Sequence, residues 1–436
     1  MPRLAPLLGR YSANPHLEDL TQRIGSDLFA RLEGGKPTLF SGKWFDDQLM
    51  AWSMDDELVK VQLFRFIDVL PALLGSTPNI VRHVKEYFSL AKHRLPLPLR
   101  WGLNLLPQRG PLASLVASTA RSNAIRLARR FIAGSNVPEA LRAIESLRKQ
   151  RCAFTIDLLG EAVLTEAEAD HYQHQYLELV EGLTAAAQWK IDPQMDCDPL
   201  GPMPQVNISI KLSSLYSQFD PIDPEGSAAA VKVRLLPILR MIRDRGAFVN
   251  IDMEQFSYKE TTLRIFEEVF SEPEFRQWPH VGIAIQAYLR SCGEDLARLL
   301  AFVKRRGTPV WVRLVKGAYW DYETAIAEQN DWQPPVFLNK WESDVNYERQ
   351  TSFLLQNYEY LRPAFGSHNI RSIAHALAQA RLLNLPEKCI EFQLLYGMAD
   401  QIKDALVDMG HRVRVYTPSG QLLPGMAYLV RRLLEN

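Results

Sequence analysis

The stretch Val312-Arg313-Leu314-Val315-Lys316-Gly317-Ala318-Tyr319-Trp320 combines an apolar strand pattern with two cations and ends at a glycine followed by an aromatic pair. A buried strand normally excludes Arg and Lys unless they are paired or bind a ligand, because desolvating an unpaired charge costs several kcal/mol. That cost is comparable to the stability margin of a domain. The stretch therefore predicts a functional site at the end of a buried strand. A structural salt bridge is the alternative interpretation.

Apolar strands and helices alternate on both sides of this stretch, from about residue 134 to the end of the chain. Together with Pro309 to Val315, the predicted strands cover 152–156, 206–212, 248–253, 281–287, 364–368, 389–394 and 412–416. Helix ends lie between them: Thr165 and Glu168 form a capping box, and Gly246 and Gly307 follow basic residues. Eight strands that alternate with helices predict an α/β fold, a parallel sheet closed as a (βα)8 TIM-type barrel.

An open doubly wound sheet is the alternative to the barrel. No glycine-rich dinucleotide fingerprint follows any of the predicted strands, and polar residues gather at many strand ends. Both observations favour the barrel.

The region before the barrel has helical periodicity and no convincing strand. Val59, Leu63, Phe66, Ile67 and Leu70 recur at spacings of three and four, and Pro71 then predicts an interruption of that helix. The sequence therefore predicts an all-helical N-terminal region over residues 1–133, followed by the barrel over residues 134–436.

Composition excludes several classes of function. The 436 residues contain 50 Lys plus Arg and 50 Asp plus Glu, so no global field attracts nucleic acid, and no nucleic-acid partner is expected. The four cysteines are scattered without a CxxC motif, which indicates a reducing cytoplasm and disfavours a zinc site. His171 and His174 are interpreted as a solvated helix face, and no metal is expected. No apolar run reaches the roughly 20 residues that a membrane span needs. Peripheral contact with a membrane through a surface helix stays open.

Chemically capable residues follow every predicted strand. Because active sites of such barrels lie at the carboxyl ends of the strands, we expect these residues to meet there. In strand order they are Asp157, Glu161, Lys211, Asp252, Glu254, Gln286, Tyr288, Arg313, Lys316, Tyr319, Trp320, Ser367, His368, Asn369, Gln393, Leu395, Tyr396 and Tyr416. Each has a structural alternative, such as a Lys211–Asp252 ion pair or a core position for His368. The shared location makes a common site the better interpretation.

The last predicted helix carries Tyr428 about one turn from the adjacent Arg431 and Arg432. Two neighbouring guanidinium groups beside apolar residues suit bidentate capture of a carboxylate or a phosphate. A surface arginine pair is the alternative.

These motifs taken together resemble the flavin-dependent proline dehydrogenase domain of the bifunctional proline-utilisation flavoenzymes. The resemblance is carried, in family order, by DLLGEA (157–162), SIKLSSLY (209–216), NIDMEQ (250–255), IQAY (285–288), VRLVKGAYWD (312–321), SHN (367–369), EFQLLYGM (391–398) and YLVRRLLEN (428–436). It implies a distorted (βα)8 barrel that holds FAD noncovalently, after a helical arm and domain.

The resemblance also implies roles for individual residues. Cofactor contacts would come from Gln286, Arg313 near flavin N5, Lys316, Trp320, Ser367, His368, Asn369 and Glu435. The substrate carboxylate would be bound by Lys211, Arg431 and Arg432, and its ring would be walled by Asp252, Tyr319, Leu395, Tyr416 and Tyr428. Arg313, Asp252, Tyr319 and Tyr416 are therefore the expected catalytic set. Two departures from the family pattern are the apolar character of Val336–Lys340, which bears on the adenine contacts, and Tyr396, where some relatives have His.

The implied reaction is the oxidation of L-proline to 1-pyrroline-5-carboxylate, the first step of proline catabolism, with electrons passed to a quinone-type acceptor. The implied partners are that quinone and a 1-pyrroline-5-carboxylate dehydrogenase domain or protein. The chain is expected in the cytoplasm, with peripheral association at the inner face of the membrane left open. Two other functions stay open at this point: a metal-free lyase or aldolase that forms a Schiff base through Lys211 or Lys316, and a noncatalytic binding protein.

Overall fold

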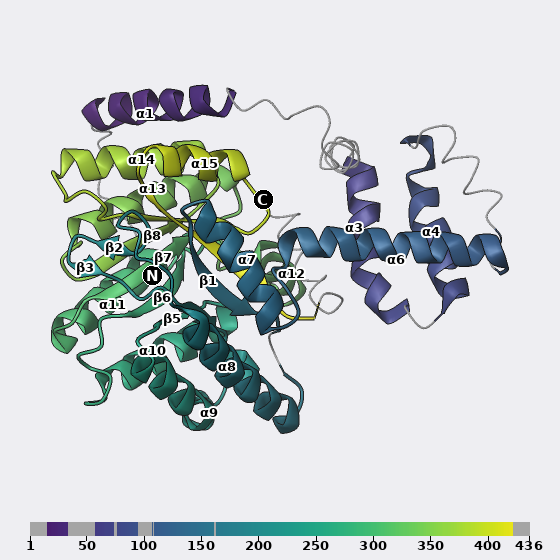
Figure 1. Cartoon of the computed structure of the whole chain (residues 1–436), viewed down its shortest axis with the longest axis horizontal. Helices are drawn as coiled ribbons and strands as arrows, with labels where there is room; N and C mark the ends of the chain where they lie inside the picture. The colour runs from purple at the N-terminus through teal and green to yellow at the C-terminus, as the bar shows by residue number, and fades with distance from the viewer. Residues whose placement is uncertain are drawn as a thin grey trace.

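The structure is a computed structural model that describes residues 15–33, 57–73, 76–94, 107, 109–160 and 163–421. Its central feature is a closed barrel of eight strands in the order β1-β10-β9-β8-β7-β6-β5-β4 (Figure 1). All eight neighbouring pairs are parallel. The predicted (βα)8 barrel is confirmed, and the open doubly wound sheet is excluded. The strands are β1 Ala153–Leu158, β4 Asn207–Ile210, β5 Phe248–Ile251, β6 Val281–Gln286, β7 Val310–Val315, β8 Leu361–Gly366, β9 Glu391–Leu395 and β10 Arg412–Ser419.

Helices surround the barrel, with α7 before β1 and the others between successive strands. They are α7 Val137–Lys149, α8 Glu166–Ala186, α9 Pro224–Asp244, α10 Lys259–Ser271, α11 Cys292–Arg306, α12 Trp320–Gln329, α13 Lys340–Gln356, α14 Ile370–Leu382 and α15 Asp400–Asp408, with the 3-10 turns η2 Leu212–Leu215 and η3 Phe256–Tyr258. The predicted capping box of Thr165 and Glu168 is present, and Gly307 ends α11 in the left-handed conformation at φ 79°.

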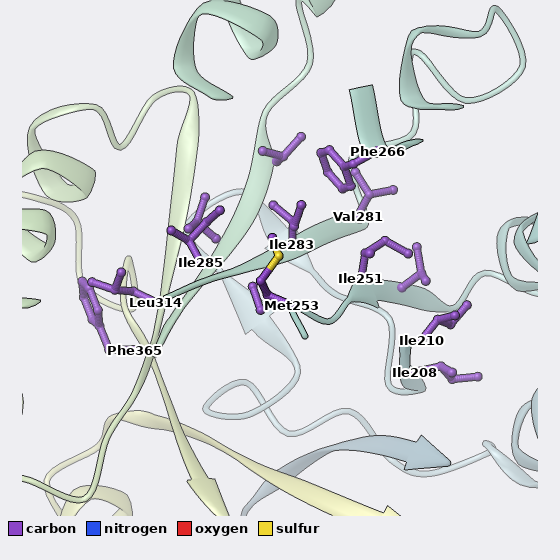
Figure 2. Close-up of a cluster of buried hydrophobic side chains, with 14 of the residues drawn as sticks. Ile208, Ile210, Ile251, Met253, Phe266, Val281, Ile283, Ile285, Leu314 and Phe365 are labelled. Carbon is purple, nitrogen blue, oxygen red and sulfur yellow. The ribbon is translucent and has the colours of Figure 1, made fainter. Parts of the chain in front are cut away.

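Side chains of the barrel strands alternate between an apolar outer face and a polar interior. Ile208 and Ile210 of β4 belong to the apolar layer between strands and helices (Figure 2). Their neighbours in β4 point the other way, and Asn207 accepts hydrogen bonds from Thr155 of β1 (2.7 Å) and Asn250 of β5 (3.0 Å). The main hydrophobic core therefore lies outside the sheet. The interior holds a network of polar side chains and a small apolar cluster of Met203, Phe248, Trp311 and Ala364.

The amino-terminal end of the barrel holds a buried ionic cluster. The Glu391 carboxylate lies 3.1 Å from Arg412 Nε and 2.8 Å from Arg414 Nε, and all three side chains are almost fully buried. The Arg412 guanidinium also lies 4.9 Å from the centre of the Trp311 ring and donates to the carbonyl of Cys197. That carbonyl belongs to a two-stranded hairpin, β2 Cys197–Asp198 and β3 Gly201–Pro202, which the sequence analysis missed because each strand has only two residues.

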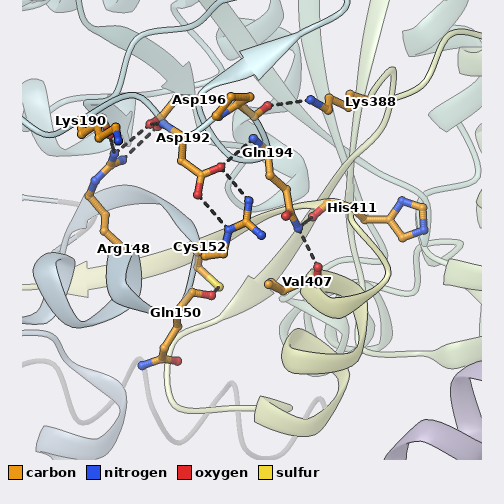
Figure 3. Close-up of polar contacts among 12 residues, drawn as sticks. Arg148, Gln150, Cys152, Lys190, Asp192, Gln194, Asp196, Lys388, Val407 and His411 are labelled. Carbon is orange, nitrogen blue, oxygen red and sulfur yellow. Dashed lines mark hydrogen bonds and ion pairs between the residues drawn. The ribbon is translucent and has the colours of Figure 1, made fainter.

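The segment before this hairpin is fixed from two sides (Figure 3). Arg148 at the end of α7 makes a buried bidentate pair with Asp196, at 2.8 and 3.0 Å. Gln194 donates to the carbonyls of Val407 (2.7 Å) and His411 (3.1 Å), which flank the connection from α15 to β10. These contacts hold the hairpin segment beneath the barrel, away from the carboxyl ends of the strands.

Described residues before the barrel form the helices α1 Pro15–Glu33, α3 Glu57–Leu73, α4 Thr77–Leu90 and α6 Pro111–Phe131 and the 3-10 turn η1 Lys92–Arg94. Helix α1 lies along α14, whereas α3, α4 and α6 stand apart to one side of the barrel (Figure 1). For the described residues of this region, the predicted helical character is confirmed. The predicted interruption at Pro71 is wrong, because α3 continues through it to Leu73 and accommodates the proline in its last turn.

Some predicted strand boundaries also shift. The strand predicted at 364–368 begins at Leu361 and ends at Gly366, so it contains Pro363. A proline donates no ladder hydrogen bond and is uncommon inside a central strand, which hides the true start from sequence reasoning. Ser367 and His368 consequently lie just beyond the strand rather than in it.

Candidate active site

A network of buried charges lies at the carboxyl ends of β1, β4, β5, β7 and β10. The Lys211 ammonium pairs with Asp157 Oδ1 and lies 3.5 Å from the Tyr416 hydroxyl and 3.8 Å from Asp252 Oδ2. Asp252 in turn pairs with Arg313 and accepts a hydrogen bond from Tyr416 at 2.7 Å. All five side chains are buried. Strands separated by more than 200 residues in the sequence therefore build one continuous ionic network.

Arg313, the cation of the opening stretch, makes three kinds of contact. Its NH1 group pairs with Asp252, and its NH2 group donates to the Ser209 hydroxyl at 3.0 Å. The guanidinium carbon lies 5.1 Å from the centre of the Tyr416 ring, within cation–π range. The Nε–H of Arg313 is buried and has no hydrogen-bond partner in the part of the chain that the structure describes.

Charge compensation decides the protonation of Lys211. Burial would lower the pKa of the Lys211 ammonium, but the carboxylates of Asp157 and Asp252 outweigh burial and raise that pKa above its ordinary value. Burial is also the main reason that the pKa of Asp157 is raised; Lys211 opposes this shift and Asp252 adds to it. Lys211 is therefore a cation at neutral pH, suited to bind an anion.

The backbone at Lys211 is fixed as well as its ammonium group. Lys211 is the residue that precedes η2, and its N–H donates to the Tyr176 hydroxyl of α8 at 3.4 Å. Its carbonyl accepts a hydrogen bond from the Ser214 hydroxyl at 2.6 Å. The strand-to-turn change at this point directs the side chain across the barrel mouth rather than along the strand.

Gln286 at the end of β6 is positioned by its neighbour β5. Its Nε2 donates to the carbonyl of Glu254 at 3.1 Å, while its Oε1 is buried without a partner among the described residues. The Glu254 carboxylate accepts from the Ser213 backbone N–H at 3.1 Å and from the Ser213 hydroxyl. Glu254 thus joins η2 to the end of β5 and holds the amide of Gln286 in one orientation.

The segment after β7 turns sharply outward at Gly317, whose φ of 143° is open mainly to glycine. A Cβ there would lie 2.4 Å from the Tyr288 ring. Before the turn, Lys316 pairs with Asp344 of α13. After the turn, Tyr319 precedes α12, and Trp320 donates from Nε1 to the carbonyl of Phe337 at 2.9 Å. The segment after β7 therefore places Lys316 against α13, Tyr319 at the start of α12 and Trp320 against Phe337.

Ser367, His368 and Asn369 form the connection from β8 to α14. The Ser367 hydroxyl accepts from the Asn369 N–H at 3.1 Å, and Asn369 Oδ1 caps α14 by accepting from the Ser372 N–H at 3.0 Å. His368 Nε2 accepts from the Leu395 N–H at 3.0 Å. Burial lowers the pKa of His368 to about 4, so the ring is neutral and carries its proton on Nδ1. His368 thereby links β8 to β9 and aligns Leu395.

Most of the predicted strand-end residues thus meet at one end of the barrel, with three qualifications. Gln393 belongs instead to the amino-terminal ionic cluster, where its Nε2 donates to the Glu391 carboxylate at 2.7 Å. Glu161, Tyr428, Arg431, Arg432 and Glu435 lie outside the described residues. The Lys211–Asp252 ion pair, which was the structural alternative for these residues, is present but is a longer contact than the Lys211–Asp157 pair. Sequence reasoning listed Asp157 and Glu254 among the strand-end residues without giving them individual roles, and it missed Ser209 and Asp344. A usable signal exists for Ser209 and Asp157, since both occupy inward positions in strands whose alternate residues are apolar.

No group of three or more His, Cys, Asp or Glu residues that could hold a metal ion occurs in the described part of the chain. His174 instead contacts the backbone carbonyl of Asp170 through Nδ1, and His171 lies edge-on to Tyr172. The four cysteines are free thiols.

The fold and the site define the class of protein. The chain is a closed (βα)8 barrel with buried cations and carboxylates at the carboxyl ends of its strands, which is where barrel enzymes have their active sites. The family model described as proline dehydrogenase matches residues 140–436, and that of the proline utilization A N-terminal domain matches residues 18–131. The chain therefore belongs to the proline dehydrogenase family.

Similar proteins include bifunctional enzymes and single-function ones. The bifunctional protein PutA of Klebsiella aerogenes is 31% identical over 313 residues, which cover 70% of this chain and 23% of that protein. The proline dehydrogenase of Deinococcus radiodurans is 29% identical over 322 residues, which cover 74% of this chain and 90% of that protein. The crystal structure of proline utilization A from Bdellovibrio bacteriovorus inactivated by N-propargylglycine is similar at a TM-score of 0.86 and 44% identity, over 97% of this chain and 41% of that chain. The chain thus spans about a quarter of the length of the curated bifunctional relatives.

Proposed function

We propose that the chain oxidises L-proline to 1-pyrroline-5-carboxylate with FAD as cofactor, the first step of proline catabolism. The observation that carries the proposal is the buried Lys211–Asp252–Arg313–Tyr416 network at the strand ends of a proline dehydrogenase family barrel. Family membership supports the reaction class, and the network supplies a charged ammonium, that of Lys211, at the strand ends.

The substrate carboxylate requires cations, and Lys211 is a charged one at the barrel mouth. In this proposal Arg431 and Arg432, beyond the described residues, add two guanidinium groups that suit a planar carboxylate. Tyr319, Leu395, Tyr416 and Tyr428 wall the ring together with Asp252. Fixing the carboxylate and the ring leaves one ring carbon next to nitrogen to face the cofactor, which is the alignment that hydride transfer needs.

The residues present fit FAD. Arg313 Nε–H and Gln286 Oε1 are buried without partners in the described chain, one a donor and one an acceptor, on adjacent strands. An isoalloxazine edge offers both an acceptor nitrogen and N–H and carbonyl groups that complement such a pair. In this proposal Gln286, Arg313, Lys316, Trp320, Ser367, His368, Asn369 and Glu435 hold the cofactor. FAD supplies the hydride acceptor when it is bound.

The chain's own groups contribute electrostatics and order to this reaction. Arg313 keeps a fixed positive charge beside the proposed flavin position, where it stabilises negative charge without transferring a proton. Asp252 holds Arg313 and Tyr416 in place through the two contacts described above. Tyr416 presents its ring to Arg313 and its hydroxyl to Asp252, so its orientation is fixed at both ends.

Electron transfer to a quinone-type acceptor, and a 1-pyrroline-5-carboxylate dehydrogenase domain or partner that takes the product, belong to the same proposal. The bifunctional relatives support the second of these. Among the described helices, none combines the length and the apolar character that a bilayer crossing demands. Peripheral contact with the inner face of the membrane would bring the site to a lipid-soluble quinone, and a vesicle flotation assay tests this contact.

The flavin spectrum of the purified protein tests the proposal. We expect FAD absorbance, and we expect L-proline to bleach it in the absence of oxygen. A colourless protein that takes up no added FAD would overturn the proposed cofactor, and a coloured protein that proline leaves oxidised would overturn the substrate.

The Schiff-base alternative is disfavoured by the geometry. A lysine that attacks a carbonyl must lose its proton, yet Lys211 is held charged by two carboxylates and Lys316 is paired with Asp344. Membership in the proline dehydrogenase family also favours an oxidoreductase over a lyase or aldolase. A noncatalytic binding protein would show no proline-dependent reduction of a synthetic electron acceptor.

A further inference from the structure

Asp157 is a fully buried carboxylate at the candidate site. The sequence analysis listed Asp157 among the strand-end residues but gave it no individual role. It lies on β1, opposite Ser209 of β4 in the sheet register, and its side chain is 0% exposed. A carboxylate buried in this way is strongly unfavourable unless a cation compensates it. The cation that does so is Lys211, whose ammonium pairs directly with Asp157 Oδ1.

Lys211 has a competing acceptor within reach. Asp252 Oδ2 lies 3.8 Å from the ammonium nitrogen, so a small rotation would bring Lys211 onto Asp252 instead. Asp252 already binds Arg313 and Tyr416. The nearer contact with Asp157 thus draws Lys211 toward β1 and leaves Asp252 to Arg313.

The four charged groups balance one another: two cations, Lys211 and Arg313, face two carboxylates, Asp157 and Asp252. Each cation has one carboxylate of its own as its closest partner. Loss of Asp157 would leave both cations to share Asp252, and the ammonium of Lys211 would move away from the position in which it meets a substrate anion.

We propose that Asp157 is a positioning residue that sets where the Lys211 ammonium meets the substrate carboxylate. This inference rests on the proposed function, because it takes L-proline as the substrate. The Asp157 carboxylate also interacts with the Tyr416 hydroxyl. In this proposal its effect on the reaction runs through Lys211, so it belongs to substrate binding and not to the chemical step.

A double-mutant cycle with D157N and K211M tests this role. KM and kcat for L-proline are measured with a synthetic electron acceptor. The dissociation constant of cyclopentanecarboxylate, a ring carboxylate without the oxidisable nitrogen, is measured from the flavin spectrum. We expect D157N to raise both KM and that constant about tenfold, and K211M to raise them about ten- to hundredfold, as the loss of a charge-assisted hydrogen bond would. The double variant should equal K211M within about twofold, because Asp157 has nothing left to position.

Asp295 provides a matched control, since it forms a buried ion pair with Lys259 of comparable exposure, 8% and 4%, between α10 and α11. D295N removes the same chemistry elsewhere and should leave KM unchanged. Unchanged KM in D157N, or a double variant in which the two effects multiply, would overturn the positioning role. If D157N does not fold, the cycle is run with D157S. Wild-type protein that does not oxidise proline would refute the proposed function instead, and the cyclopentanecarboxylate measurements would still decide the role of Asp157.

Discussion

Arg313 shows how one buried side chain can serve both the fold and the proposed reaction. Its two terminal nitrogens bind Asp252 and Ser209, and these contacts hold the guanidinium plane in one orientation. The remaining Nε–H is buried and has no partner among the described residues. A well-held group with one unused donor is preorganised for a ligand atom.

R313M should therefore slow anaerobic flavin reduction by proline far more than it weakens proline binding. The loss of one charge-assisted contact predicts a reduction rate lower by about ten- to hundredfold, with a proline dissociation constant within about threefold of wild type. Stopped-flow reduction over a range of proline concentrations separates the two. R298M is the control, because Arg298 on α11 pairs with Glu260 and Glu267, away from the candidate site. Equal losses in rate and affinity would contradict the placement of Arg313 beside the flavin.

Arg431 and Arg432 give a second prediction at this scale. If both bind the substrate carboxylate, replacing either with Met removes contacts worth about 1.5 to 3 kcal/mol, so proline affinity should fall about ten- to hundredfold. Flavin content should survive. Titration of a competitive carboxylate against the flavin spectrum measures the effect. R129M is the control, since Arg129 is exposed and belongs to an adjacent arginine pair on α6. Unchanged affinity in both single variants would assign the pair to a surface role.

Residues of the candidate site often lie at the end of a helix or strand, and the start of α14 is the clearest example. Its cap is Asn369, directly after His368, and two residues further on Arg371 reaches away from the site. Arg371 makes a bidentate contact with Glu18 of α1, at 2.9 Å for both bonds, and a second one with Glu348 of α13. The start of α14 is thus tied to the N-terminal helix on one side and to the proposed cofactor-binding turn on the other.

The α1–α14 contact should be sensitive to acid. Hydrogen bonding to Arg371 lowers the pKa of Glu18 from its ordinary 4.5 to about 2. Because the folded pKa is the lower one, the contact stabilises the fold above about pH 4.5 and loses its effect as pH falls toward 2. The Glu18 side chain is 39% exposed, so solvent screening limits the contribution to about 1 kcal/mol or less. Urea unfolding between pH 6 and pH 3 should show a steeper loss for wild type than for E18Q. Parallel pH profiles would contradict this prediction.

Gly317 makes a second prediction at the element scale. Its positive φ and the closeness of the Tyr288 ring mean that G317A must move the start of α12. Strain in a glycine-only conformation costs about 1 to 3 kcal/mol, and the displaced turn should lower flavin content as well as stability. G307A is a matched control: Gly307 also has positive φ, but no atom lies within 4 Å of its Cβ position. The control should lose about 1 kcal/mol with flavin content unchanged. Normal flavin content in G317A would show that the turn tolerates a side chain.

At the scale of the whole molecule, the two ends of the barrel hold different groups of buried charges. The carboxyl ends of the strands hold the candidate site, and the amino ends hold the Glu391–Arg412–Arg414 cluster over the hairpin. Burial would raise the pKa of Glu391, but Arg414 and Arg412 outweigh it and lower that pKa to about 2. One carboxylate therefore compensates two buried cations, and the closure of β9 against β10 depends on it.

E391Q should destabilise the protein without changing the site. Leaving two buried guanidinium groups without their carboxylate costs about 3 to 5 kcal/mol. The midpoint of urea unfolding should fall accordingly, while KM for proline measured below the unfolding range stays at the wild-type value. D19N removes an exposed carboxylate paired with Arg23 on α1 and should cost less than about 0.5 kcal/mol. A stability loss in E391Q no larger than that of D19N would contradict the role given to the cluster.

The sequence by itself determined the eight barrel strands and their order, favoured a closed barrel over an open sheet, and indicated the end at which most of the site residues gather. Strand and helix periods are local properties, and right-handed parallel connections leave few topologies for eight alternating units. The set from Lys211 to Tyr416 could therefore be placed at one rim before any coordinates were known. The alternation inside strands such as Asn207–Ile210 also indicated a polar interior, although sequence reasoning did not use it.

Only the tertiary structure decided which charge pairs with which. Lys211 and Asp157 are 54 residues apart, and Arg313 and Asp252 are 61 apart, so neither pair leaves a local signal. Their distances depend on how the eight strands are staggered around the barrel, which is a property of the closed sheet. The same holds for Arg371 and Glu18, 353 residues apart, and for the small hairpin held by Arg412. Charge pairing inside a barrel is set by long-range packing, and a single sequence records the charges without recording their partners.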